Sequence, residues 1–223
     1  MSENENPETN LIDLADLGIQ TADEMSDEMA VLTKTSDFLP QVRVYGSENN
    51  LVKEGKFPLG TFGLYHSSDK VVELGKEFNS ICISSRPRAC IIGDTPVSFY
   101  DFKSDSFTAV KEKSFAKADG HLVGLEYMLW LPSVACFALF FMGTITLRRE
   151  SENVRAQIGK GLSLKIKLIT GKKYKWHGCT AFPCSAPMDL PKEEDLRLEL
   201  TKFQNPPAET VEVAKEPEGT RKR

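Results

Sequence analysis

Residues 162–170, LSLKIKLIT, alternate apolar and polar side chains along most of their length. The even-numbered positions from Leu162 to Leu168 are all apolar, whereas Ser163, Lys165 and Lys167 between them are polar. A period of two places the apolar side chains on one face of an extended strand, and a helix would scatter them around its surface. The alternation therefore predicts a strand with one buried face.

Shorter segments repeat this pattern elsewhere in the chain, and most of them end near a glycine, proline or aspartate. The segments lie at 38–46, 61–67, 70–75, 80–85 and 96–102. Helical patterns are few, and we expect helices only at 105–117 and 188–203. Short strands at this spacing predict a mainly β (α+β) fold built as a small antiparallel barrel or sandwich with one or two short helices.

The most apolar part of the chain runs from Tyr127 to Leu147, 21 residues without a charge. This length is enough to span a bilayer, and Arg148 and Arg149 would suit a cytoplasmic flank, so a membrane anchor is one interpretation. Pro132 divides the run into two pieces, each of a normal length for a buried strand or core helix. We favour the buried pieces, and so expect no contact with a membrane.

Charge divides the chain into three segments. Residues 1–37 contain ten acidic residues and one basic residue, whereas residues 38–188 contain 20 basic and 13 acidic residues. We predict an acidic mobile arm at 1–36, a β-rich nucleic-acid-binding domain at 38–190, and a short helix with a disordered tail at 191–223. A basic middle inside an acidic chain indicates a surface that binds a polyanion.

The two ends and the cysteines indicate a compartment. The N-terminus, MSENENPETN, has neither a basic nor an apolar stretch, so we expect no secretory signal. The five cysteines are an odd number spread along the chain, which favours free thiols in a reducing environment. We therefore expect a soluble, intracellular protein.

The basic surplus is concentrated at 148–175, where nine basic residues face two acidic ones. A turn after Thr170 leads into alternating lysines and aromatic residues, with Tyr174 and Trp176 on one face and Lys173 and Lys175 on the other. Lysines can meet phosphates, and aromatic rings can stack on unpaired bases. The candidate nucleic-acid-binding residues are Arg148, Arg149, Lys160, Lys165, Lys167, Lys172, Lys173, Tyr174, Lys175 and Trp176. The other interpretation makes both aromatic residues part of the core and the lysines an ordinary solvated face.

Arg86 and Arg88 are two further candidates for phosphate binding. We place them at the end of the strand 80–85, where Pro87 stiffens the junction and two guanidinium groups suit phosphate oxygens. A plain charged loop is the alternative.

Other chemistries have weaker support. His177, Cys179 and Cys184 have a metal-like spacing, but a structural zinc site needs about four ligands and no nearby residue supplies the fourth. A metal-dependent nuclease would need clustered acids, for which Asp94, Asp101 and Asp105 are the nearest set. We predict no cofactor, no metal and no catalytic residue.

Several short motifs resemble a set of uncharacterised tailed-phage proteins. They are Phe38-Leu39-Pro40, Leu74-Gly75-Lys76-Glu77, Arg86-Pro87-Arg88-Ala89, Phe99-Tyr100-Asp101, Phe140-Phe141-Met142-Gly143 and Arg148-Arg149-Glu150, and they cover about 38–190. This resemblance implies a phage origin, and with it the host cytoplasm, but no activity.

A second resemblance joins Gly159–Lys167 and Tyr174-Lys175-Trp176 to the late strand and hairpin of phage single-stranded-DNA-binding proteins with an OB-fold. It implies an OB-like barrel that acts in DNA replication, recombination or repair, with single-stranded DNA as partner and replication proteins recruited by an acidic tail. Here the acidic segment is N-terminal and the chain ends Arg221-Lys222-Arg223, so recruitment would pass to the acidic arm. A homo-oligomer is compatible with this reading. The alternative is a phage structural or host-interaction protein without nucleic-acid binding.

Overall fold

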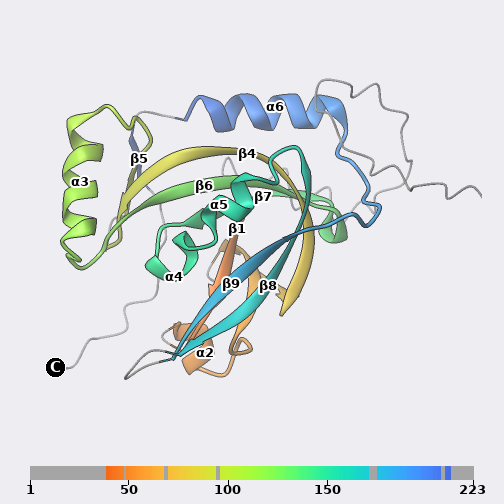
Figure 1. Ribbon diagram of the computed structural model, residues 1–223, viewed down its shortest axis with the longest axis horizontal. Coiled ribbons are helices and arrows are strands. Elements are labelled where there is room, and N and C mark those ends of the chain that lie inside the picture. The colour runs from red at the N-terminus through yellow and green to blue at the C-terminus, as the bar shows by residue number, and fades with distance from the viewer. Residues whose placement is uncertain are drawn as a thin grey trace, which may run out of the picture.

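The computed structural model describes residues 39–47, 49–67, 70–93, 96–170, 175–206 and 209–211 (Figure 1). This part of the chain is mainly β, with one strongly curved ten-stranded sheet and five short helices. The strands are β1 (Gln41–Tyr45), β2 (Thr61–Ser67), β3 (Lys70–Gly75), β4 (Glu77–Ile91), β5 (Val97–Phe99), β6 (His121–Leu131), β7 (Cys136–Met142), β8 (Lys160–Thr170), β9 (Lys175–Pro183) and β10 (Glu209–Val211). The helices are α2 (Asn50–Lys53), α3 (Asp105–Phe115), α4 (Ile145–Arg148), α5 (Ser151–Arg155) and α6 (Glu193–Gln204). The expected mainly β class is confirmed, as are the two helices expected near 105–117 and 188–203.

The sheet is organised around β4, a strand of 15 residues. The order is β10-β5-β4-β6-β7-β1-β2-β3, and β8 joins β4 while β9 joins β8. The first half of β4 pairs with β8, and its second half pairs with β6 on one edge and β5 on the other. The described pairings between these strands are antiparallel except that of β1 with β7. β4 therefore connects the hairpin β8–β9 to the rest of the sheet.

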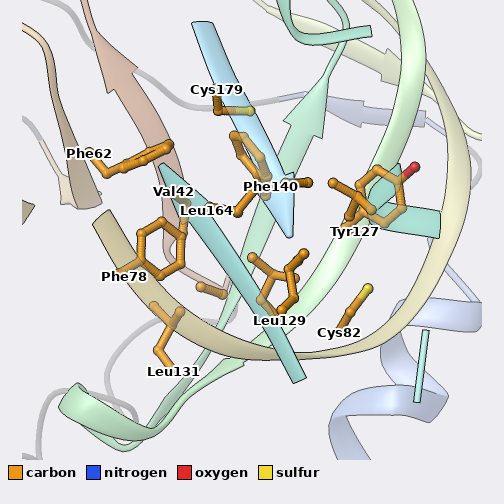
Figure 2. Packing of buried hydrophobic residues seen from close by; sticks show 14 of the residues in the cluster. Val42, Phe62, Phe78, Cys82, Tyr127, Leu129, Leu131, Phe140, Leu164 and Cys179 are labelled. Carbon is orange, nitrogen blue, oxygen red and sulfur yellow. The ribbon is translucent and has the colours of Figure 1, made fainter. Parts of the chain in front are cut away.

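The concave side of the sheet encloses the largest core (Figure 2). Strands from both ends of the sheet order contribute to it, because the curvature brings β1 and β2 opposite β8 and β9. Aromatic rings fill its centre, and Phe62 meets Phe78 edge to face with ring centroids 4.9 Å apart. The fully buried members include Phe62, Cys82, Tyr127, Leu129, Leu131, Ala138, Phe140, Met142, Leu162 and Leu164. The alternation predicted for 162–170 thus supplies part of this core.

Two helices cover opposite faces of the long strands, with α6 on the convex face and α3 on the face that Val123 shares with Tyr127 and Leu129 of the main core. α6 lies along β4 and β6 and packs Leu196 and Phe203 on Ile83, Met128 and neighbouring side chains (Figure 1). Figure 1 shows α3 at the other end of these strands, where a separate small core joins it to the sheet. Both faces of β4 and β6 are therefore buried over much of their length.

This double burial explains the long uncharged run. β6 ends at Leu131, Pro132 begins a single 3-10 turn that runs to Val134, and β7 follows at Cys136. The prediction of two buried pieces divided at Pro132 is confirmed for β6 and β7, whereas Ile145 beyond β7 is exposed. Strands buried on both faces carry continuous apolar sequence in place of alternation. In the described ranges, no helix combines the length and apolar character needed to cross a bilayer.

The strand expected at 80–85 is much longer than predicted. β4 continues through Arg86-Pro87-Arg88, and Pro87 is in register with Leu125 of β6. On its other edge β4 pairs with β8 only as far as Cys82 and with β5 only from Ala89. Pro87 falls in the interval between these two partners, where a missing N–H breaks no ladder hydrogen bond. The prediction that the strand ends before Arg86 is therefore wrong.

Candidate nucleic-acid interface

The predicted basic hairpin is β8 with β9, in a continuous antiparallel register from Leu162 opposite Pro183 to Thr170 opposite Lys175. Directly opposed residues share a face of an antiparallel pair. One face therefore carries the pairs Leu164 with Ala181 and Ile166 with Cys179, and it closes the main core. The other face carries Lys165 and Lys167.

The lysine face is open to solvent along part of its length. Lys165 and Lys167 are exposed, and Phe182 on the same face is 45% exposed. Phe182 lies opposite Ser163, and Lys165 lies opposite Thr180, so the aromatic ring and the first lysine belong to neighbouring pairs. Ammonium groups and an aromatic ring on one exposed strand pair are the two features that single-stranded nucleic acid requires.

An acidic residue on β4 extends this face. The Glu77 carboxylate lies 3.2 Å from the Lys165 ammonium and accepts a 3.4 Å hydrogen bond from the Ser163 hydroxyl. The side chains of Glu77 and Lys165 are 51% and 59% exposed, so water screens the pair. Lys165 therefore remains accessible to a competing anion.

The far edge of β9 is covered by the two short helices α4 and α5. The Glu150 carboxylate, between these helices, accepts a 3.4 Å hydrogen bond from the Ala181 N–H of β9. A side chain at Gly178 would come within 3.4 Å of the Thr146 carbonyl oxygen, which shows how closely α4 approaches the strand. This cover occupies an edge that would otherwise pair with another strand.

The remaining basic candidates of this region do not all gather on the lysine face. Arg149 is exposed at the end of α4 beside β9, but the Arg148 guanidinium points to α3 and lies 5.9 Å from the centre of the Phe115 ring. Lys160 is exposed at the start of β8, in register with Cys82 of the core face, and so lies on the opposite side from Lys165.

The tip of the hairpin is described only in part. Lys172, Lys173 and Tyr174 lie outside the described residues. Lys175 and Trp176 belong to β9, and the register sets Trp176 opposite Ile169. Position 176 therefore falls on the face of Lys167, whereas position 175 falls on the core face.

The second predicted candidate, the pair Arg86 and Arg88, is buried in the molecule. Both guanidinium groups bind the Glu126 carboxylate of β6, Arg86 Nη2 at 2.6 Å and Arg88 Nη1 at 2.7 Å. The side chains of Arg86, Arg88 and Glu126 are 14%, 4% and 0% exposed. We call these three residues the buried ion cluster.

Every part of the buried ion cluster has partners inside the protein. Arg88 donates two hydrogen bonds to the Ser98 hydroxyl, at 2.9 and 3.1 Å. Arg86 donates to the Phe203 carbonyl at the end of α6, at 2.6 Å, and lies between the rings of Tyr100 and Phe203.

Burial works against the charge on Arg88, but the Glu126 carboxylate outweighs it and raises the arginine pKa. Burial, followed by Glu126, also raises the pKa of Tyr100. The two arginines thus hold the sheet and α6 together and are not presented to a phosphate.

Among the described residues, the side chains named for the metal-site and nuclease alternatives do not form a cluster that could bind a metal. Cys179 is buried in the main core, where burial raises the pKa of its thiol to about 12. Asp101 accepts a hydrogen bond from the Lys103 N–H at the start of α3, and Asp94 lies outside the described residues. In the part of the chain that the structure describes, no three His, Cys, Asp or Glu side chains gather as a metal site would require.

Three residues of these sites are not among the predicted candidates. Phe182 continues the period-two pattern of its strand, so the sequence was sufficient to predict which face of the strand carries this ring. Glu77 contacts Lys165, which lies 88 residues later in the chain, and Glu126 contacts Arg86, which lies 40 residues earlier. A local sequence pattern cannot indicate pairs that are so far apart in the chain.

Comparison of this chain with protein-family models, with curated proteins and with solved structures finds no match.

Proposed function

We propose that this chain binds single-stranded DNA on the lysine face of the hairpin β8–β9. The observation that carries the proposal is the presence of Lys165, Lys167 and the exposed Phe182 on one face of a two-stranded ribbon. The basic surplus of the chain centres on this ribbon, which supports the same choice. In line with the resemblance, the role is in DNA replication, recombination or repair of a phage.

The mechanism combines electrostatic attraction with stacking. Lys165 and Lys167 meet successive phosphates and release condensed counterions, and Phe182 stacks on an unpaired base. Position 176 continues the lysine face along β9, Arg149 lies beside β9, and the predicted contacts of Lys172, Lys173 and Tyr174 are part of the same proposal. A duplex offers no free base face, so the single strand binds more tightly. An OB-like barrel, with the hairpin as one wall of its groove, is part of this proposal.

A titration of the purified protein with a fluorescent single-stranded 30-mer and the matching duplex, at several salt concentrations, tests the proposal. Contact with about four to six phosphates gives a slope of log K against log salt near −3 to −4. The variant with Lys165→Gln and Lys167→Gln should bind more weakly. Its matched control carries Lys111→Gln and Lys113→Gln, two exposed lysines of α3. Equal loss in both variants, or a response independent of salt, would contradict the proposal.

The alternative, a phage structural or host-interaction protein, has one observation in its favour. Phe115 of α3 and Ile145 of α4 are 61% and 53% exposed, and Arg148 of α4 lies over the Phe115 ring. Exposed apolar side chains on adjacent elements suit a protein partner. This function predicts no affinity for either DNA and a stable oligomer in sedimentation that the double variant Phe115→Ser, Ile145→Ser dissociates.

A further inference from the structure

A depression of about 550 Å³ opens beside the lysine face, at the first residues of β4. It lies where β4 and β6 separate, because β6 pairs with β4 only from Ile81 onward and ends at Leu131. The segment that follows β9 forms its other side. That segment crosses directly over β8, since a side chain at Gly161 would come within 2.1 Å of the Cys184 carbonyl oxygen. The lining residues are Leu74, Glu77, Phe78, Asn79, Pro132, Ser133, Pro187, Met188 and Asp189.

The lining combines flat apolar walls with hydrogen-bonding groups at the rim. Pro132, Pro187 and Met188 supply apolar surface, and the exposed Asn79 and Asp189 supply an amide and a carboxylate. Among the described residues of the lining there is no lysine, arginine or histidine. A phosphate would therefore be repelled, whereas a planar group that offers N–H donors would be accepted.

The depression is continuous with the proposed DNA-binding face. Glu77 belongs to its lining and also forms the ion pair with Lys165. A single strand with a phosphate on Lys165 would thus carry the adjacent nucleotide to the rim of the depression. A nucleobase is a planar heterocycle with hydrogen-bonding edges, and it matches the chemistry of this lining.

We propose that the depression holds one base of the bound strand and selects bases with an exocyclic amino group at the pairing edge (cytosine, adenine or guanine) over thymine, which has none. This inference rests on the proposed function. Carboxylates accept from the cytosine amino group, and asparagine pairs with the adenine edge. Thymine places a carbonyl oxygen at the equivalent position, which a carboxylate repels. Asp189 and Asn79 are the specificity-determining residues.

Binding of fluorescent (dC)15, (dA)15 and (dT)15 tests the selection. We expect the unmodified protein to bind (dC)15 or (dA)15 about ten-fold more tightly than (dT)15, the discrimination given by one good base contact. In the Asp189→Ala and Asn79→Ala variants this ratio should fall below about three-fold, while the affinity for (dT)15 is kept or slightly improved. Asp119→Ala removes an exposed acid from a distant turn and should keep the full ratio.

The outcomes separate this inference from the proposed function. Equal affinity of the unmodified protein for all three oligomers, with salt-sensitive binding retained, would overturn base selection alone. Absence of binding to every oligomer would overturn the proposed function together with this inference. Thermal unfolding of each variant excludes loss of the fold as the cause of a changed ratio.

Discussion

Arg86 with Arg88, and Lys165 with Lys167, are two pairs of basic residues with the same spacing on a strand, and the fold treats them in opposite ways. Across from the arginines stands Glu126, with no exposed side-chain surface. Across from Lys165 stands Glu77, whose side chain is half exposed. The difference shows that spacing on a strand does not decide whether a basic pair is structural or available to a ligand. The depth of the acid on the neighbouring strand decides it.

The largest expected effect is at Glu126. Glu126→Gln leaves two buried guanidinium groups without their counter-charge, and we expect the free energy of unfolding to fall by about 3–5 kcal/mol. Urea unfolding followed by circular dichroism measures this loss. Glu77→Gln is the matched control and should lose under about 1 kcal/mol, because its pair is exposed. Similar losses in the two variants would remove the distinction between the two pairs.

The next effect concerns the aromatic ring on the lysine face. Phe182→Ala should weaken binding of a single-stranded 30-mer by about 1–3 kcal/mol, the contribution of one stacked base, with little change in stability. Phe102→Ala removes a ring of similar exposure before α3 and should leave the affinity unchanged. A Phe182 variant that unfolds more easily but binds normally would assign the ring to packing.

A smaller effect is expected for the lysines singly. Each phosphate contact contributes about 0.7 to the slope of log K against log salt for a single strand. Lys165→Gln and Lys167→Gln should therefore each lower the magnitude of the slope by about 0.7. Titrations at several salt concentrations between about 50 and 200 mM measure this change. A slope that either variant leaves unchanged would exclude that lysine from phosphate contact.

The smallest effect is the release of Lys165 from its ion pair. Glu77→Gln removes the competing carboxylate, so the affinity for (dT)15 should rise by about two- to five-fold, in keeping with the weak interaction of exposed pairs. The homopolymer (dT)15 is the probe because thymine makes none of the amino-group contacts on which the proposed base selection depends. Weaker binding in this variant would mean that Glu77 orients Lys165 for the phosphate.

Local pattern was sufficient for elements whose two faces differ. The strand at 162–170 follows from its alternation, and the division of the uncharged run follows from Pro132. The full length of β4 was not predictable, because arginines within a strand indicate an exposed end unless their partner is known. That partner, Glu126, lies 38 residues beyond Arg88 in the chain.

The candidate site was predictable to the same degree. Alternation placed Lys165 and Lys167 on a face opposite the core, and the register agrees. The ion pair with Glu77 and the depression next to it depend on which strands lie side by side and on how the segment after β9 returns across Gly161. Such arrangements are set by the pairing of the whole sheet, and they cannot be predicted from the sequence of a single strand.

The length of β4 has a consequence for how the molecule unfolds. At about 3.3 Å per residue its 15 residues extend roughly 50 Å, and they supply Phe78 to the main core, Ile83 to the core under α6 and Ala89 to the core under α3. No one of these cores can melt without disturbing a strand that the other two share. We therefore expect a single cooperative transition, with the amide protons of β4 among the slowest to exchange with solvent.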